Sequence, residues 1–237
     1  MKIVLTLLIL LTLGLLGYGF YQAIYGAPTE ETMGDIQRIF YYHVPSAWTA
    51  GVLFFANFVA SIVYLVKRNQ CADACALATA EVGVVFCTVV LLTGPLWAKP
   101  VWGIWWTWDA RLTTTLVLWL IYVSYLMLRR FSDGQQTPVL AAALAIFGFL
   151  DVPIVYMSIR WWRTQHPQAV IGGGPGSGLD PNMKHALFFN WYAFLAMAAL
   201  ITFARYKLAR AEQEQEHAHA MATVQEDVGE WQKAEVR

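Results

Sequence analysis

Four tryptophans lie within seven residues of this chain, and an acid and a base follow them at once. The run consists of Trp102, Trp105, Trp106 and Trp108, followed by Asp109 and Arg111. Each indole N–H needs a hydrogen-bond partner when it is buried, so such a cluster is poor filler for a core. The run is also too polar to cross a bilayer. It fits either an aromatic belt at a membrane surface or one wall of a slot for a large, flat aromatic ligand.

Two histidines far apart in the sequence are expected at the same depth as the tryptophans. Pro45 follows His43 closely, and proline favours the first turn of a helix, which predicts His43 at the mouth of a helix that begins near residue 46. Pro181 precedes His185 in the same way and predicts it in the first turn of the last long helix. Taken singly, each histidine would more often be an interfacial residue bonded to backbone or water.

Together, beside an aromatic wall, the two histidines favour a metal ligand role. Imidazole binds iron, zinc or copper. The surrounding sequence offers no thiolate and no obvious carboxylate cluster, so two axial nitrogens beside an aromatic slot suit haem iron better than zinc. His166 lies in a third aromatic-rich segment with Trp161 and Trp162, and we expect it to cover the ligand rather than to bind the iron.

Basic residues accompany these aromatic segments. Arg111, Arg160, Arg163 and Lys99 are expected on the same side of the membrane. They could pair with the two haem propionates, or they could extend toward lipid phosphate and pair with Asp109. Asp109 and Arg111 are two residues apart and do not face each other along a helix. Asp109 is therefore expected to cap the next helix.

The elements that must position these residues are membrane-spanning helices. The chain has 237 residues, is 58% hydrophobic and 14% charged, and has a mean hydropathy of +0.46, whereas a soluble domain carries about a quarter charged residues. Six stretches are long enough to span a bilayer, at 3–24, 46–66, 77–97, 112–129, 138–158 and 184–204. The sequence predicts an all-α polytopic membrane protein with six transmembrane helices. The formal net charge of zero argues against nucleic-acid binding.

The distribution of Lys and Arg predicts the orientation. These residues favour the side that holds both termini, which places the N- and C-termini in the cytoplasm and the tryptophan loop, at about 98–111, outside. Residues 1–210 are then a six-helix transmembrane domain, and residues 211–237 an acidic cytoplasmic tail that we expect to be partly disordered. Glu81 and Asp151 fall within predicted spans, where we expect them to form polar contacts between helices.

The tryptophan run resembles the WWD signature of haem-handling membrane proteins. His43-Val-Pro45-Ser-Ala-Trp48 and Trp161-Trp162-Arg163-Thr-x-His166 are similar to motifs of one branch, the CcmC (haem exporter protein C) family of cytochrome c maturation. The resemblance covers roughly residues 20–205. Gln165 departs from the pattern, since a bulkier apolar residue is expected before His166.

This resemblance implies a haem-transfer scaffold in the bacterial inner membrane, with no catalytic residues. It implies that His43 and His185 are the axial ligands of haem b and that the tryptophan loop holds the ring edge. Haem would be presented at the periplasmic face to the haem chaperone CcmE, with CcmA, CcmB and CcmD as further partners and lipid around the helices.

Two other functions remain open on the residues alone. A cytochrome b-type electron-transfer protein would need histidine pairs inside the spans, and no predicted span holds an internal histidine pair. A permease that moves haem across the bilayer would need a polar path, for which Asn57, Glu81, Asp151 and Asn190 are the candidates.

Overall fold

The computed structural model describes residues 2–132, 134, 136–167, 169–171 and 178–235. These residues form helices joined by loops, with no strand among them. The helices are α1 (Lys2–Tyr21), α2 (Phe40–Lys67), α3 (Gln70–Trp102), α4 (Ala110–Phe131), α5 (Thr137–Phe149), α6 (Asp151–Trp161) and α7 (Pro181–Glu235). A π-helical turn, Gln22–Gly26, continues α1, and a 3-10 helix, Asp35–Ile39, leads into α2.

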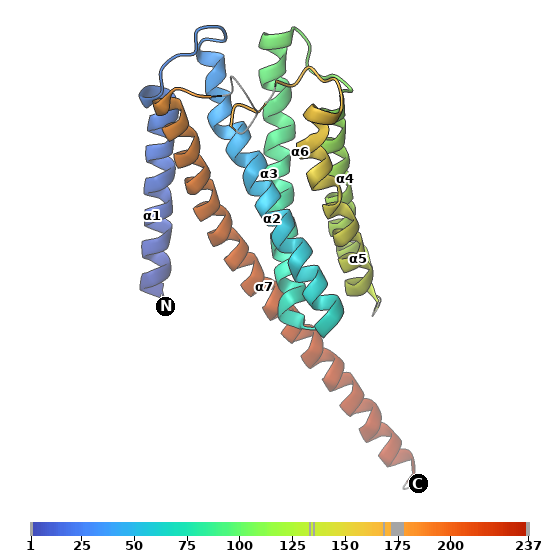
Figure 1. The fold of residues 1–237 in the computed structure, drawn as a ribbon. Coiled ribbons are helices and arrows are strands. Elements are labelled where there is room, and N and C mark those ends of the chain that lie inside the picture. The colour runs from blue at the N-terminus through green and yellow to red at the C-terminus, as the bar shows by residue number, and fades with distance from the viewer. Residues whose placement is uncertain (1, 133, 135, 168, 172–177, 236–237) are drawn as a thin grey trace.

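Six helical stretches of the described chain are long and apolar enough to cross a membrane, as predicted. The fifth is α5 and α6 together, and each of the others contains one of the remaining α-helices. In Figure 1, α2 and α3 run through the middle of the bundle, with α4, α5 and α6 on one side and α1 and α7 on the other. α1 packs mainly against α7, whereas α3 contacts α2, α4 and α7.

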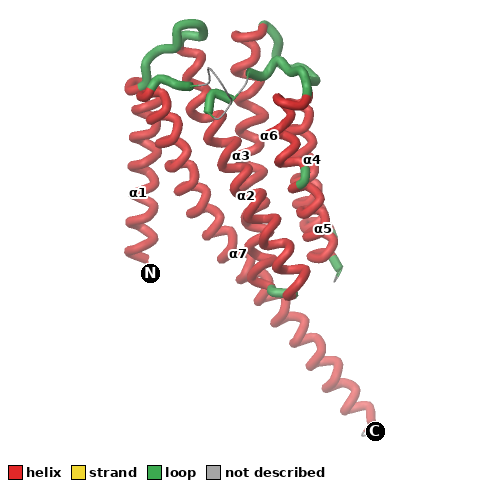
Figure 2. Tube along the Cα trace, in the orientation of Figure 1, coloured by secondary structure: helices red, strands yellow, loops and turns green. Residues whose placement is uncertain are grey.

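The long connections gather at one end of the bundle, which we call the tryptophan end (Figure 2). It holds the loop 103–109 and the connections 27–39 and 162–180. Both chain termini lie at the opposite end (Figure 1), where the connections are short. The predicted separation of the termini from the tryptophan loop is therefore present, and the cytoplasmic location of the termini stays a prediction.

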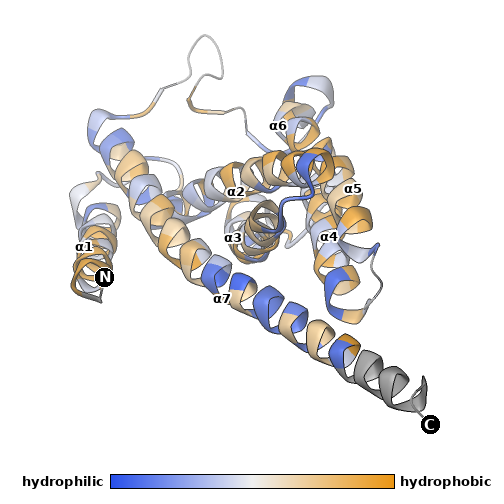
Figure 3. Ribbon diagram, turned by 90° about the horizontal axis from the view of Figure 1, so that it is seen from below, coloured by the Kyte–Doolittle hydropathy of each residue, from blue (hydrophilic) through white to orange (hydrophobic). Residues whose placement is uncertain are grey.

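The centre of the bundle is packed around stacked aromatic rings. Phe54 of α2 and Tyr122 of α4 lie with ring centroids 3.8 Å apart and an interplanar angle of 16°. Gly83 of α3 makes room for this stack, because a Cβ there would lie 2.7 Å from Phe54 Cε1. Apolar residues predominate along the helices of the bundle, and α7 is hydrophilic in its first turn and again where it leaves the bundle (Figure 3).

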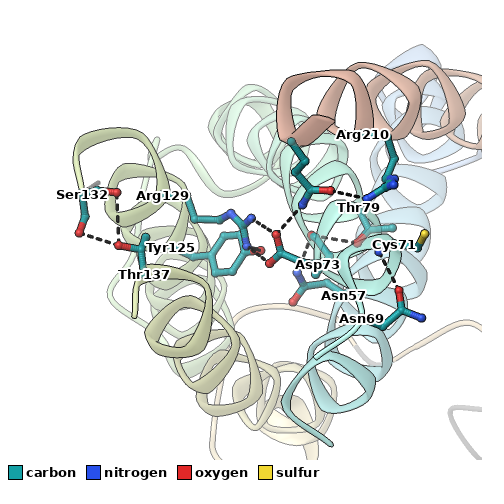
Figure 4. A network of polar contacts seen from close by, with 12 residues as sticks. Asn57, Asn69, Cys71, Asp73, Thr79, Tyr125, Arg129, Ser132, Thr137 and Arg210 are labelled. Carbon is teal, nitrogen blue, oxygen red and sulfur yellow. Dashed lines mark hydrogen bonds and ion pairs between the residues drawn. The ribbon is translucent and has the colours of Figure 1, made fainter. Parts of the chain in front are cut away.

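Polar contacts join α7 and α4 to α3. Figure 4 shows Asp73 of α3, whose two carboxylate oxygens each accept a hydrogen bond of 2.7 Å from Arg129 of α4. The Gln213 amide of α7 also donates to Asp73, at 2.9 Å. Higher in the bundle, Arg205 of α7 forms an ion pair of 2.6 Å with Glu81 of α3. The polar helix–helix contact expected of Glu81 is confirmed.

Asp151 behaves differently from Glu81. It is the first residue of α6, directly after the break between α5 and α6. Its side chain is buried, and Asp151 Oδ2 has no hydrogen-bond partner in the described part of the chain. The helix–helix polar contact expected of it is therefore not found for this oxygen.

Two helix boundaries at the tryptophan end differ from the sequence-based prediction. α2 begins at Phe40 rather than near residue 46, so His43 lies inside the helix and Pro45 in its second turn. The extra turn buries Phe40 and Tyr41 in a cluster with α7 residues, and this burial outweighs the single backbone hydrogen bond that Pro45 removes. α3 likewise runs on to Trp102 and ends at Gly103, whose φ of 78° suits glycine.

The acidic segment after residue 210 continues α7 as a helix to Glu235. Its side chains up to residue 225 are almost all exposed. The last two residues of the predicted tail lie outside the described residues, and partial disorder of the tail stays a prediction.

Candidate functional site

His43 lies in the first turn of α2 and is held by one turn of α3. Its Nδ1 lies 2.8 Å from Thr93 Oγ1, and its ring meets Trp97 edge to face, with centroids 5.8 Å apart at 72°. Gly94 sits between these two contacts, and a Cβ there would lie 3.6 Å from His43 Cε1. Three neighbouring α3 residues therefore fix the position of the ring.

The Thr93 hydroxyl determines which His43 nitrogen carries the proton. Thr93 Oγ1 donates its only hydrogen to the Val89 carbonyl at 2.7 Å, as threonines in helices commonly do. The same oxygen must then accept from His43, so His43 Nδ1 carries the hydrogen. In the neutral ring this leaves Nε2, on the side away from Thr93, as an unprotonated nitrogen.

His166, in the connection after α6, is held in the same tautomer. Its Nδ1 lies 2.9 Å from the Pro167 carbonyl oxygen, which can only accept a hydrogen bond. Burial, with a smaller contribution from the nearby Arg111 charge, lowers the pKa of His166 to about 4 against the opposing effects of the Pro167 carbonyl and Asp109. The ring is therefore neutral at pH 7, with Nε2 unprotonated.

His43 and His166 lie near each other and near Arg111. Both rings are within electrostatic range of the Arg111 guanidinium, and they are within electrostatic range of one another. The structure thus places two imidazoles, from α2 and from the connection after α6, within electrostatic range of a cation at the start of α4.

Asp109 ties the tryptophan loop to the His166 segment. It caps α4, as predicted, with Oδ1 accepting from the Leu112 N–H at 3.0 Å. Its Oδ2 accepts from the Thr164 hydroxyl at 2.7 Å, and Thr164 in turn accepts from the His166 N–H at 3.0 Å. One carboxylate therefore fixes both the start of α4 and the backbone at His166.

The tryptophans of the run lie in different environments. Trp102 is half-buried in the last turn of α3, whereas Trp105 and Trp108 are 56% and 75% exposed. Trp106 packs edge to face on Trp108, with centroids 5.6 Å apart. Lys99 lies over the Trp105 ring at 5.9 Å. The loop thus presents exposed indole surface at the end of the bundle.

Two buried donors near this loop have no acceptor in the described part of the chain. They are Trp106 Nε1 and Arg111 Nη1. A buried guanidinium nitrogen without a partner is costly, so an acceptor from a bound molecule would stabilise it. A ligand that carries carboxylates fits these donors.

The other predicted site residues are more dispersed. His185 lies on α7, where it contacts Phe189 and, from α1, Tyr18, with ring centroids 6.0 and 6.5 Å away. Arg160 of α6 lies over the Tyr156 ring at 5.6 Å, and Arg163 is exposed. The contacts of His185 therefore face α1, and its predicted pairing with His43 stays a prediction.

Three residues that position the histidines were missed by the sequence analysis. They are Thr93, Trp97 and Thr164. A signal exists for two of them, because Thr93 and Trp97 are four residues apart and so share one face of α3. Thr164 precedes His166 by two residues, a spacing at which hydroxyls often accept from the backbone.

A bundle of six helical stretches able to span a bilayer, with imidazoles, a half-buried arginine and exposed indoles at one end, defines a multi-pass membrane protein. Comparison with known proteins identifies the family. The family model described as CcmC, Heme exporter protein C, matches residues 1–221. The chain belongs to this family.

Individual relatives agree with the family match. The protein Heme exporter protein C of Escherichia coli strain K12 is 35% identical over 202 residues, which cover 84% of this chain and 78% of the relative. The protein of the same name from Bradyrhizobium diazoefficiens is 38% identical over 184 residues, 77% of this chain and 70% of the relative. A putative cytochrome c biosynthesis ccmC-like mitochondrial protein of Marchantia polymorpha is 31% identical over 180 residues, 76% of each chain.

Proposed function

We propose that this chain binds haem b at the tryptophan end and delivers it to the haem chaperone CcmE during cytochrome c maturation. Its membership of the Heme exporter protein C family supports a role in haem export. In this proposal the tryptophan end faces the periplasm of a bacterial inner membrane. CcmA, CcmB and CcmD are the other partners. Haem is the cargo, and the chain acts as a transfer scaffold rather than as an enzyme.

The observation that carries the proposal is the pair His43 and His166. Each has its Nδ1 hydrogen engaged, by Thr93 and by the Pro167 carbonyl, and each therefore has Nε2 free to bind iron. Their mutual proximity supports His43 and His166 as the axial ligands. The pair predicted from the sequence, His43 with His185, is the alternative.

The surrounding residues suit the rest of a haem molecule. Trp106 Nε1 and Arg111 Nη1 are buried donors that propionate oxygens would satisfy. Arg160 and Arg163 are the further candidates for the propionates, at the edge of the site. The indoles of Trp102, Trp105 and Trp108 would contact the ring edge, with Asp109 keeping the loop in place.

Single alanine variants at the three histidines test the ligand assignment. The full chain is purified with its haem in detergent, and optical spectra are recorded for His43→Ala, His166→Ala and His185→Ala. We expect the low-spin bis-imidazole bands to be lost in the first two and kept in the third. Loss at His185 with retention at His166 would restore the pair predicted from the sequence. Unchanged bands in all three would refute histidine ligation.

A transfer assay tests the delivery step. The haem-loaded chain is mixed with haem-free CcmE, and haem is followed on each protein after separation. We expect haem to move to CcmE, and to move less from a Trp105→Ala, Trp108→Ala double variant, whose exposed indoles are removed. Haem that stays on the chain after prolonged mixing with CcmE, CcmA, CcmB and CcmD together would contradict the proposal.

A further inference from the structure

Thr93 carries a half-buried hydroxyl to which neither the sequence motifs nor the family match assigns a role. It lies on α3, fifty residues after His43 in the chain, and reaches the His43 ring across the α2–α3 interface. Thr88 of α3 makes a comparable polar contact, with the indole N–H of Trp119 on α4. The position of Thr93 makes it the partner of a proposed iron ligand.

The hydrogen bonds of Thr93 make its hydroxyl oxygen an acceptor toward His43. A threonine hydroxyl has one hydrogen, and the contact of 2.7 Å to the Val89 carbonyl uses it. The contact of 2.8 Å to His43 must then be a hydrogen bond from Nδ1–H to the hydroxyl oxygen. In the other tautomer the Thr93 hydroxyl would have to give up its bond to Val89 to donate to Nδ1, and Nε2 would have no lone pair for a metal.

The strength of this acceptor also matters. A carboxylate at this position would draw the Nδ1 hydrogen strongly and make the ring a more basic, tighter ligand. Thr93 and the Pro167 carbonyl are both uncharged acceptors, and the acid nearest to His166, Asp109, bonds to Leu112 and Thr164 instead. Uncharged acceptors orient the rings and strengthen them as ligands less than a carboxylate would, which suits a protein that must give up its cargo.

We propose that Thr93 is a positioning residue that fixes His43 in the Nδ1–H tautomer and, as an uncharged acceptor, raises the basicity of the ring only modestly. This inference rests on the proposed ligand role of His43. The tautomer itself is a property of the haem-free protein and can be measured without any ligand.

The first test measures the tautomer directly. The haem-free chain is labelled with ¹⁵N-histidine, and the two ring nitrogens of His43 are identified by comparison with His43→Ala. We expect a protonated Nδ1 and an unprotonated Nε2 in the native chain and in Thr93→Ser, which keeps the hydroxyl. Thr93→Val and Thr93→Ala remove the acceptor and should shift His43 toward the other tautomer. An Nε2–H tautomer in the native chain would overturn the proposal.

The second test measures the effect on haem. Removing an outer partner of a metal-bound histidine typically weakens binding about 10- to 100-fold, so we expect that loss of haem affinity in Thr93→Val and a more positive haem midpoint potential. Thr93→Ser should keep both native values. Thr12→Val is the control, because the buried Thr12 hydroxyl bonds back to the Leu8 carbonyl of its own helix, as Thr93 does to Val89, and is far from the proposed site.

The outcomes separate the two proposals. If Thr93→Val keeps native affinity and potential while His43→Ala loses its haem bands, Thr93 has no positioning role and the ligand assignment stands. If His43→Ala keeps its bands, the ligand assignment itself fails, whatever Thr93 does. Should the valine variant unfold, Thr93→Ala provides the same comparison with a smaller side chain.

Discussion

Replacing Asp73 by asparagine removes one charge from the most buried ion pair among the described residues. The Asp73 side chain is 5% exposed and that of Arg129 is 12% exposed, and two hydrogen bonds of 2.7 Å join them. Asp73→Asn keeps the shape of the side chain and one acceptor oxygen but leaves the guanidinium charge without a counter-charge. The variant therefore isolates the contribution of the charge.

The expected cost follows from this burial. Breaking a buried pair by removing one partner costs about 3–5 kcal/mol, and the remaining amide oxygen places Asp73→Asn near 3 kcal/mol. For a chain of this size, each kcal/mol lowers the melting temperature by about 2–4 °C. We therefore expect the melting temperature to fall by about 6–12 °C, measured by tryptophan fluorescence in one detergent.

The matched control is an exposed ion pair of the same chemistry. Asp35 pairs with Arg38 at 2.9 Å, but the Asp35 side chain is 80% exposed, so Asp35→Asn should cost less than about 1 kcal/mol. The double variant Asp73→Asn, Arg129→Gln should recover part of the lost stability, because neither charge is then left alone. Equal melting temperatures for Asp73→Asn and Asp35→Asn would refute the reasoning.

Three further predictions concern packing, pH and helix association. Gly83→Ala should lower the free energy of unfolding by about 1 kcal/mol, because crowding against Phe54 costs more than the higher helix propensity of alanine gains. Gly51→Ala, with open space around it, should not lower it. Parallel thermal melts of the two variants decide this. The His166 segment should detach as the pH falls from about 6.5 toward 4, because the detached ring binds a proton that the buried ring excludes. Its docking should not vary with pH above 7. Protease digestion of that segment measures this, and a digest that does not change across the range would contradict the low pKa. Asn190→Ala should cost about 1 kcal/mol, since its amide donates to an α1 carbonyl at 3.0 Å; a melting temperature equal to that of the native chain would show that this bond does not hold α1.

The architecture was predictable from the sequence because it depends on hydropathy and length. Six apolar stretches predicted six spans, and all six are present. The helix ends were less predictable, because they depend on tertiary contacts. Pro45 marked the start of α2 in the sequence, but burial of Phe40 and Tyr41 against α7 extends the helix beyond it.

The functional site was predictable only where local interactions determine it. Asp109 acts as the helix cap that its position indicated, because capping is a local interaction. The neighbours of each histidine are set by helix rotation and by the path of a connection, which a single sequence does not encode locally. His43 therefore contacts Thr93 and lies within electrostatic range of His166, whereas His185 contacts Tyr18 of α1.

The length of α7 has a mechanical consequence. With 55 residues rising about 1.5 Å each, this helix is about 80 Å long, and after Pro181 its described side chains include no proline or glycine at which it would bend. Asn190, Arg205 and Gln213 attach it to neighbouring helices at three successive levels. A twist applied to the turns between Gln213 and Gln225 therefore meets no proline or glycine at which the helix could bend. It is transmitted as rotation of a single stiff rod, so the two ends of the molecule share one torsional degree of freedom.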